Sequence, residues 1–222
     1  MASILICARG GSKGIHKKNL SRLGPWTLLE WSIHMALLYV PREKIFLSSD
    51  SLEILSLGES YGITCIRRPD SLATDSSPED HTWKYFIGNY LDTKNLVDPL
   101  VILPPTSPFR NLQLFDESIA CLSHDTPLVV SAYPSARSPW FNMVKNIRNN
   151  HFEIVIPNSG FTRRQDAPPT FDLSTCFFTF IPSLFMSTKI SRYELPFTIV
   201  QVDREQTVDI DQPCDLELAR MY

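Results

Sequence analysis

The sequence predicts an α/β fold in which a mostly parallel sheet carries helices on both faces. Short apolar runs alternate with segments of helical periodicity, the connections between them are short, and polar clusters follow the apolar runs directly. The alternation is typical of parallel sheets, whose strands are buried on both faces. Such sheets bind ligands beyond the carboxyl ends of their strands, which is where the polar clusters fall.

The first elements follow from apolar spacing. Residues 3–7 ("SILIC") form a short apolar run and predict a buried strand, followed by a glycine-rich loop. Residues 27–40 carry apolar side chains at helical spacing and predict a helix. Residues 44–50 ("KIFLSSD") predict a strand that ends in polar residues, and residues 51–62 a helix that stops near its final glycine.

The same alternation continues along the chain. Residues 63–69 ("ITCIRRP") predict a strand, and residues 79–91 a helix. Residues 99–108 ("PLVILPPTSP") predict a strand that prolines interrupt, because proline cannot donate to a sheet ladder. A helix over 111–122 and a strand over 127–133 follow.

The alternation fails between residues 136 and 169 and then returns. This segment is rich in aromatic and β-forming residues but contains no clear βα unit, so we expect an insertion that forms an arm against a second subunit. Strands are expected at 175–181 and 197–202, and a final helix over 212–222 with Pro213 in its first turn. A chain of 222 residues is consistent with one domain over 1–222, with 136–169 as its arm.

Composition excludes several classes of protein. The net charge of -3 argues against a general nucleic-acid binder, and no stretch approaches the length of a membrane span. No signal peptide is recognisable. The five cysteines contain no CxxC pair and the histidines no HxxxH pattern, so we expect reduced thiols, no zinc site and a cytoplasmic protein.

The loop after the first strand concentrates positive charge. The stretch "ARGGSKGIHKKNL" (8–20) places glycines and basic residues beside each other. Glycines let backbone N–H groups approach an anion, and the cations would neutralise it. The pattern is neither GxxxxGK[ST] nor GxGxxG. A solvated basic turn is the alternative, but its position directly after a buried strand favours a triphosphate site.

Two aspartates near the end of the chain are candidate metal ligands. In "TVDIDQP" (207–213), an extended strand would place Asp209 and Asp211 on one side and Ile210 in the core. Two carboxylates suit Mg²⁺, which also binds substrate phosphates. The alternative is two surface aspartates, one of which caps the final helix.

Three further polar clusters follow the predicted strands or lie in the arm. They are "RRPDSLATD" (67–75), "PPTSPFR" (104–110) and "TRRQDAPP" (162–169). The arginines can recognise a phosphate or carboxylate bidentately. Ordinary turn chemistry or surface charge would explain each cluster taken alone.

Taken in order, these motifs resemble those of the acylneuraminate cytidylyltransferases, the CMP-sialic acid synthetases. The similarity runs from Ile4 to Ala219 and includes "ARGGSKGIHKKNL", "RRPDSLATD", "LPPTSPFR", "RRQDAP" and "DIDQPCDLELA". The resemblance implies a Rossmann-like three-layer nucleotidyltransferase fold, a homodimer with an interlocking β-rich arm, and transfer of CMP from CTP to a nine-carbon α-keto acid sugar with Mg²⁺. The stretch "RRQDAP" is similar to that of members that handle bacterial sugars such as legionaminic acid.

The resemblance also assigns residues. Those implied to bind CTP are Arg9, Gly11, Ser12, Lys13, Lys18, Asn19, Arg68 and Asp75. Those implied on the sugar side are Thr106, Ser107, Arg164 and Gln165, and Asp209 and Asp211 would hold the metal. Arg9, Lys18 and Asp211 are the expected catalytic residues.

The chain departs from the family pattern at three sites. His16 and Pro104 stand where the family usually has proline and glutamine, and Ser174-Thr175 where it has asparagine followed by glycine or alanine. The last two departures fall on the implied sugar side. Three alternatives therefore stay open: a cytidylyltransferase for an eight-carbon keto sugar, a non-catalytic CTP-binding homologue, and a metal-dependent glycosyltransferase.

Overall fold

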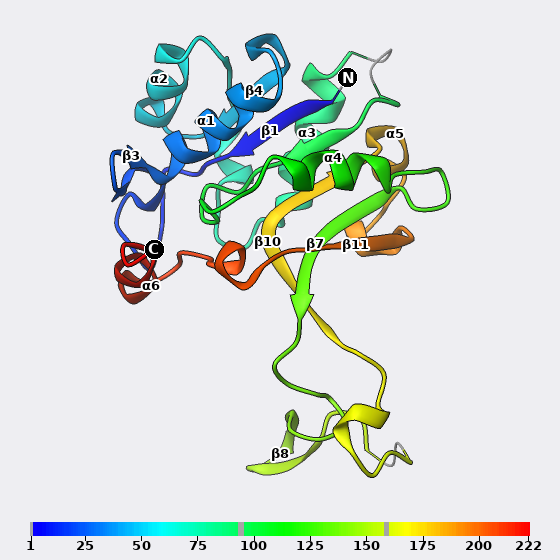
Figure 1. Ribbon diagram of the computed structural model, residues 1–222. Coiled ribbons are helices and arrows are strands. Elements are labelled where there is room, and N and C mark those ends of the chain that lie inside the picture. The colour runs from blue at the N-terminus through cyan, green and yellow to red at the C-terminus, as the bar shows by residue number, and fades with distance from the viewer. Residues whose placement is uncertain (1, 93–95, 158–159) are drawn as a thin grey trace.

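A seven-stranded sheet forms the centre of the protein in the computed structural model, which describes residues 2–92, 96–157 and 160–222 (Figure 1). The strand order is β11-β7-β10-β6-β1-β4-β5, and every neighbouring pair is parallel except those that involve β10. The strands are β1 (Ser3–Cys7), β4 (Ile45–Ser49), β5 (Thr64–Arg67), β6 (Leu100–Ile102), β7 (Leu128–Pro134), β10 (Phe171–Phe180) and β11 (Phe197–Gln201). The predicted mostly parallel sheet is confirmed.

Helices cover both faces of this sheet, because the strands are apolar on both sides. In β1, Ile4 and Ile6 pack into one core and Leu5 into the other. The first core includes side chains of α1 (Leu28–Tyr39), α2 (Leu52–Ser60) and α4 (Gln113–Ala120). The second includes side chains of α3 (Glu79–Tyr90) and α5 (Pro182–Phe185).

Local chemistry sets the ends of the first two helices. Thr27 and Glu30 form a reciprocal capping box at the start of α1, and the Ser51 side chain caps α2. The α2 helix stops just before Gly62, whose φ of 70° lies in the left-handed region that glycine tolerates. The predicted helices over 27–40 and 51–62 are confirmed to within a few residues.

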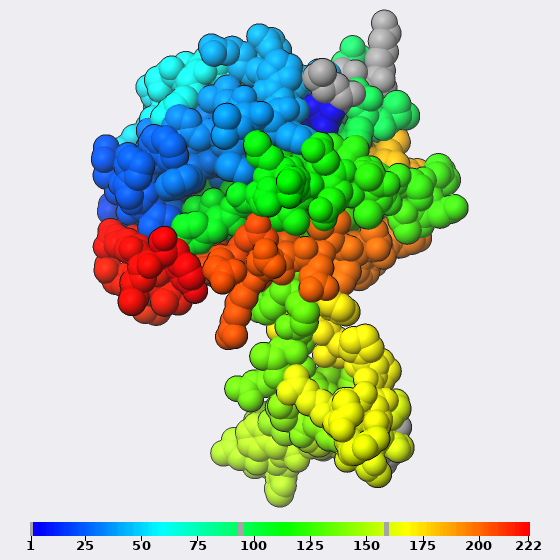
Figure 2. Space-filling view, in the orientation of Figure 1, coloured from blue at the N-terminus to red at the C-terminus, as the bar shows by residue number. Residues whose placement is uncertain are grey.

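The strand that follows the arm differs from expectation in direction. The predicted strand over 175–181 begins earlier, at Phe171, and runs antiparallel to both β6 and β7. Between β7 and β10 the chain projects away from the sheet as an arm, which contains the hairpin of β8 (Val144–Arg148) and β9 (His151–Ile154) (Figures 1 and 2). Every residue of β8 is exposed. Contact of this arm with a second subunit stays a prediction.

A small third core joins the two ends of the chain. Ile210 is fully buried among Leu23, Leu28, Leu216 and Ala219, the last two from α6 (Pro213–Ala219). The hairpin of β2 (Arg22–Leu23) and β3 (Trp26–Thr27) contributes the opposite wall. A Cβ atom on Gly14 would lie 2.0 Å from the main-chain oxygen of Asp211, so the glycine loop and the aspartate segment touch at this point.

Within the described residues, no helix combines the length and the apolar character that crossing a bilayer requires.

Replacement of Gly14 tests this close contact. We expect Gly14→Ala to lower the free energy of unfolding by about 1–3 kcal/mol, because the added methyl group must push the aspartate segment away. Gly11→Ala is the matched control in the same loop, since a Cβ there meets nothing within 4 Å. Urea unfolding measures both changes, and equal stability of the two variants would contradict the contact.

Candidate functional site

A cavity of about 340 Å³ lies beyond the carboxyl ends of β1, β5 and β6. It collects side chains from the loop after each of these strands and from the aspartate segment near the end of the chain. The residues predicted from sequence that line it are Arg9, Lys18, Asn19, Arg68, Asp75, Thr106, Asp209 and Asp211. Residues almost two hundred positions apart thus share one cavity.

Acidic side chains hold the cations of the glycine loop at this cavity. Arg9 Nη1 lies 2.5 Å from Asp75 Oδ1, and Lys13 Nζ lies 2.9 Å from the other oxygen of Asp75. Hydrogen bonds from Lys13 and Arg9 lower the pKa of the Asp75 carboxyl. The pairs are solvent-exposed, so they orient the loop more than they stabilise the fold.

Lys18 joins the loop to the aspartate pair. Its Nζ lies 2.5 Å from Asp211 Oδ1, and its side chain is only 13% exposed. The neighbouring Lys17 points elsewhere and pairs with Glu53 on α2 at 2.5 Å. Asn19 is buried, and its amide donates to the main-chain oxygen of Arg9 at 2.8 Å, so it shapes the loop from within.

Asp50, which directly follows β4, helps to hold the glycine loop in place. Its Oδ1 accepts a hydrogen bond from the Gly10 N–H at 3.0 Å and lies 3.4 Å from Arg68 Nη2. Arg68 is 5% exposed, and its buried Nε has no hydrogen-bond partner among the described residues. A buried donor of this kind at a cavity wall indicates a ligand-binding position.

Asp209 and Asp211 reach the cavity from an extended segment that belongs to no sheet. The prediction of a strand here is wrong, because residues 208–211 form no ladder. The alternation nevertheless holds: Ile210 is buried, and both aspartates line the cavity. The Ile210 N–H donates to the Thr106 main-chain oxygen at 2.9 Å, and Asp215 accepts from the Asp211 N–H at 3.0 Å.

Burial raises the pKa of Asp209, and the nearby Asp211 adds to the rise. The hydroxyls of Thr106 and Thr175 act in the opposite direction, as hydrogen-bond donors to the carboxylate. Asp209 Oδ1 is buried and has no hydrogen-bond partner among the described residues. An unpartnered carboxylate oxygen beside a second carboxylate fits a hard divalent cation such as Mg²⁺.

This pair would supply only part of a coordination shell. Among residues 2–92, 96–157 and 160–222, no group of three or more His, Cys, Asp or Glu side chains is arranged to hold a metal ion. Mg²⁺ usually keeps several waters and binds through one or two carboxylates together with substrate phosphates. The donor set therefore suits a cation that arrives with a phosphorylated ligand.

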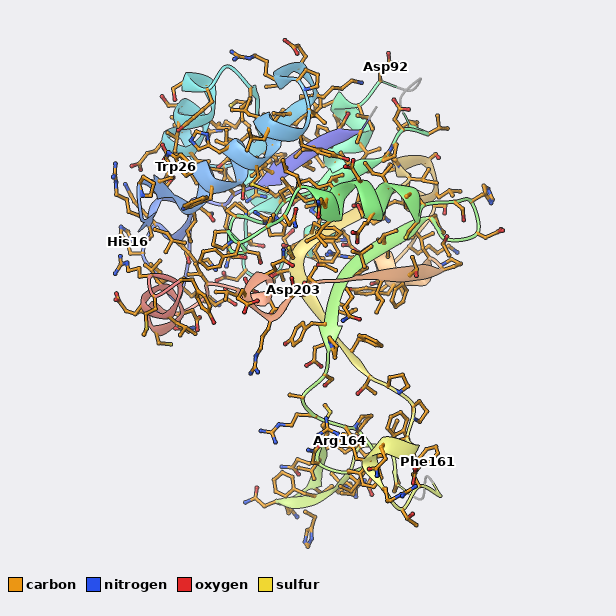
Figure 3. All side chains as sticks on the ribbon, in the orientation of Figure 1. His16, Trp26, Asp92, Phe161, Arg164 and Asp203 are labelled. Atoms are coloured by element: carbon orange, nitrogen blue, oxygen red, sulfur yellow. The ribbon has the colours of Figure 1, made fainter. Side chains whose placement is uncertain are left out.

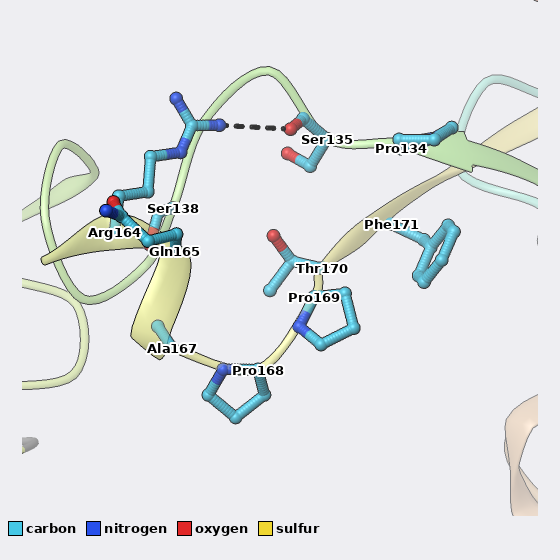
Figure 4. A pocket seen from close by; sticks show the side chains of 10 residues that line it. All are labelled: Pro134, Ser135, Ser138, Arg164, Gln165, Ala167, Pro168, Pro169, Thr170 and Phe171. Carbon is cyan, nitrogen blue, oxygen red and sulfur yellow. Dashed lines mark hydrogen bonds between the residues drawn. The ribbon is translucent and has the colours of Figure 1, made fainter. Parts of the chain in front are cut away.

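Several predicted residues lie outside this cavity. Gly11, Ser12 and Lys13 are in the loop but do not line it, and Ser107 is buried behind it with 1% exposure. Arg164 and Gln165 lie on the arm, far from the glycine loop that carries His16 (Figure 3). They line a separate cavity there (Figure 4). Arg164 Nη2 donates to the main-chain oxygens of Ser135 and Ala136 at 3.3 and 3.0 Å.

The sequence reasoning missed other residues of the site. Glu79, Thr82 and Trp83, at the start of α3, line the cavity, and so does Thr175 on β10. The sequence could have indicated Glu79, Thr82 and Trp83, because α3 follows the polar cluster at the end of β5. The N-terminus of a helix in that position faces the same edge of the sheet as the cluster. Asp50 belonged to a recognised polar cluster but was not assigned a role.

Arg110, the arginine of "PPTSPFR", supports the fold behind the cavity. Its side chain is half-buried, and desolvation of the guanidinium lowers its pKa to about 10. Its guanidinium donates to the Cys176 main-chain oxygen at 2.7 Å, to Ser32 Oγ at 3.0 Å and to the Pro104 carbonyl. Arg110 thereby fixes the proline turn that carries Pro104 and Thr106 to the cavity.

Comparison with known proteins identifies the kind of site. The family model described as cytidylyltransferase matches residues 3–79, which include the glycine loop and Arg68. The CMP-N,N'-diacetyllegionaminic acid synthase of Campylobacter jejuni is 29% identical over 98% of this chain and 94% of its own length. The chain therefore resembles cytidylyltransferases over nearly its whole length.

Further similarities concern a second curated relative and two solved structures. The N-acylneuraminate cytidylyltransferase of Escherichia coli is 27% identical over 97% of this chain, which spans 50% of that protein's length. The solved structure of a CMP:2-keto-3-deoxy-manno-octonic acid synthetase complexed with CTP superimposes with a TM-score of 0.70 at 14% identity, covering 99% of this chain and 97% of that one. A 4-diphosphocytidyl-2C-methyl-D-erythritol synthase from Anaerococcus prevotii gives 0.68 at 16% identity, with 100% and 95% covered. At these identities the structures confirm the predicted Rossmann-like nucleotidyltransferase fold alone.

The raised pKa of Asp209 makes the stability of this protein depend on pH. The folded state retains the Asp209 proton at a pH where the unfolded chain has lost it, so stability falls as pH rises through that window. With metals chelated, Asp209→Asn should therefore raise the urea midpoint at about pH 7, and the gain should shrink as pH falls below the Asp209 pKa.

The exposed Asp125 offers a control, since Asp125→Asn should leave the midpoint unchanged at both pH values. A lower urea midpoint for Asp209→Asn at neutral pH would contradict the conclusion that burial of the ionised Asp209 carboxylate destabilises the folded state.

Proposed function

We propose that the cavity holds CTP beside a nonulosonic acid, a nine-carbon α-keto acid sugar, and that the protein transfers CMP to the anomeric hydroxyl of the sugar with release of pyrophosphate. The observation that carries this proposal is the meeting of the basic glycine loop with the aspartate pair, through Lys18 and Asp211. The names of the legionaminic acid and N-acylneuraminate relatives support the class of sugar.

The basic residues would bind the triphosphate. Arg9 and Lys18 line the cavity, Lys13 pairs with Asp75 in its wall, and the present partners of all three are carboxylates that phosphate oxygens can replace. Catalysis of phosphoryl-type transfer consists mostly of positioning and charge neutralisation. The same cations would stabilise the charge that develops on the departing pyrophosphate.

The aspartate pair would hold Mg²⁺ for this reaction. Bound there, the cation would polarise the phosphate that is attacked and lower the pKa of a bound hydroxyl. Asp209 presents its unpartnered oxygen from a buried position, whereas Asp211 is exposed and paired with Lys18. Because Lys18 already contacts Asp211, its ammonium group is placed to pair with this carboxylate or with a phosphate bound beside it.

The sugar would occupy the part of the cavity formed by the loop after β6 and by β10. Thr106 offers a hydroxyl group there, and Pro104 and Pro105 form a rigid wall. Pro104 removes the amide that the related family usually has at this position, so the sugar must find its polar contacts elsewhere. The substrate hydroxyl would attack the α-phosphorus in line with the leaving pyrophosphate.

A pyrophosphate-release assay tests this function. With CTP and Mg²⁺, we expect release with at least one of N-acetylneuraminic, legionaminic and pseudaminic acid, and much slower release with an eight-carbon keto sugar. CTP binding by calorimetry without release from any sugar would instead support a non-catalytic CTP-binding protein.

Two adjacent lysines provide matched variants for this assay. Lys18→Ala should lower the rate at least about 100-fold, because it removes a positioned cation from the cavity. Lys17→Ala removes a surface pair with Glu53 and should stay within about threefold of the parent.

We also propose a homodimer in which the arm reaches the cavity of the partner. Arg164 and Gln165 resemble sugar-side residues of the related family, yet they lie on the arm, away from the cavity of their own chain. The arm hairpin exposes Val144, Ile147 and Phe152, apolar side chains that a second copy would cover. A symmetric dimer in which each arm packs against the other subunit and reaches its cavity would explain both observations.

Subunit mixing distinguishes the two placements of Arg164. Lys18→Ala and Arg164→Ala should each be inactive alone, and a randomly exchanged mixture should regain about a quarter of parental activity, because half of the dimers would contain one intact site. No recovery would place Arg164 in its own subunit's site, and a monomer by light scattering would refute the dimer.

The reaction is proposed to take place in the cytoplasm. The five cysteines are free thiols in the structure, consistent with a reducing compartment.

A further inference from the structure

The β10 strand is irregular where it passes the cavity. Its pairing with β7 is regular up to Leu173, opposite Ala132, and again from Phe178, opposite Val130. Between these pairs, residues 174–177 of β10 stand opposite Ser131 alone. Bulges of this kind change the direction of side chains and occur beside active sites.

A buried serine holds this bulge in place. Ser131 is fully buried, and its Oγ accepts hydrogen bonds from the Phe177 N–H at 3.2 Å and from Ser174 Oγ at 2.8 Å. It also lies 3.1 Å from the main-chain oxygens of Ser174 and Phe177. Ser174 is therefore turned inward to satisfy the bulge, and its hydroxyl is not available to a ligand.

The next residue faces the opposite way. Thr175 lines the cavity, and its Oγ1 shares a hydrogen bond of 2.7 Å with Ser107 Oγ. Ser107 is 1% exposed, so this bond anchors the Thr175 side chain to the loop after β6. The Thr175 hydroxyl also faces the Asp209 carboxylate, which lines the same cavity.

Asp209 needs such a neighbour because its own segment gives it little support. Residues 208–211 lie outside the sheet, so no ladder fixes the direction of the carboxylate. Near this point the segment is held by a hydrogen bond that the Ile210 N–H donates to the Thr106 main-chain oxygen. The hydroxyls of Thr106 and Thr175, which come from two other segments and line the same cavity, are placed to orient this half-buried carboxylate.

We propose that Thr175 is a positioning residue, which the β10 bulge and Ser107 hold against Asp209 so that this carboxylate is preset to bind a divalent cation. This inference rests on the proposed metal role of the aspartate pair. It gives a function to a residue at which this chain departs from the pattern of the related family, and it explains why the bulge is pinned by a buried serine.

Mn²⁺ titration followed by electron paramagnetic resonance tests the proposal on the whole chain with CTP bound and no sugar, with CTP alone as the blank. Thr175→Val keeps the shape and removes the hydroxyl, and should weaken Mn²⁺ binding about tenfold, as loss of an outer-shell partner does. Thr175→Ser keeps the hydroxyl and should stay within about threefold of the parent. In turnover assays, Thr175→Val should raise the apparent Mg²⁺ requirement by the same factor and leave the sugar KM unchanged.

Thr179→Val is the matched control on the same strand. Thr179 is fully buried and shares an equivalent hydroxyl bond of 2.8 Å with Ser118, away from the cavity. This variant should lose stability and keep Mn²⁺ affinity, so that a general effect of removing a buried hydroxyl from β10 is separated from the positioning role.

Equal Mn²⁺ affinity in the parent and Thr175→Val would overturn the role of Thr175 alone. A raised sugar KM with unchanged Mn²⁺ affinity in Thr175→Val would also overturn this role, because Thr175 would then be a substrate contact. A parent that binds no Mn²⁺ while it binds CTP would overturn the metal role itself, and with it this inference. Pyrophosphate release by the parent would show separately whether the transfer activity stands.

Discussion

The contact between the glycine loop and the aspartate segment is the constraint on which the site depends. Burial and the nearby Asp211 raise the pKa of Asp209, and Lys18, which lies 2.5 Å from Asp211, acts in the opposite direction. Gly14 permits the approach, since any side chain there would collide with the Asp211 main chain. Cations and carboxylates from opposite ends of the chain can therefore act on one ligand.

The site contains buried polar atoms that lack hydrogen-bond partners among the described residues. Arg68 Nε and Asp209 Oδ1 are buried without hydrogen-bond partners among the described residues, and each such group destabilises the folded state. The two sheet cores and their helices supply the stability that offsets this cost. The placement is consistent with groups held ready for a charged nucleotide and its cation.

The arm and the antiparallel strand have a common origin. The chain leaves the sheet at the end of β7, forms the arm and returns along β10, so the return strand runs opposite to the strand it left. That reversal places the β10 bulge between β6 and β7, where Thr175 reaches the cavity and Ser131 stabilises the irregular backbone. One insertion thus determines both the projecting hairpin and one wall of the site.

The sequence by itself determined the βα alternation and the positions of the polar clusters. Apolar periodicity and strand-end glycines are local properties, and the ordered motifs were sufficient to indicate a nucleotidyltransferase. It did not determine the direction of β10, because antiparallel and parallel buried strands have the same apolar pattern. Nor did it reveal that Ser174 turns inward and Thr175 outward, since a bulge breaks the simple alternation of side chains. Only the tertiary structure separated Arg164, on the arm, from the cavity that the other motifs form, because distance along the chain carries no information about where a projecting arm lies.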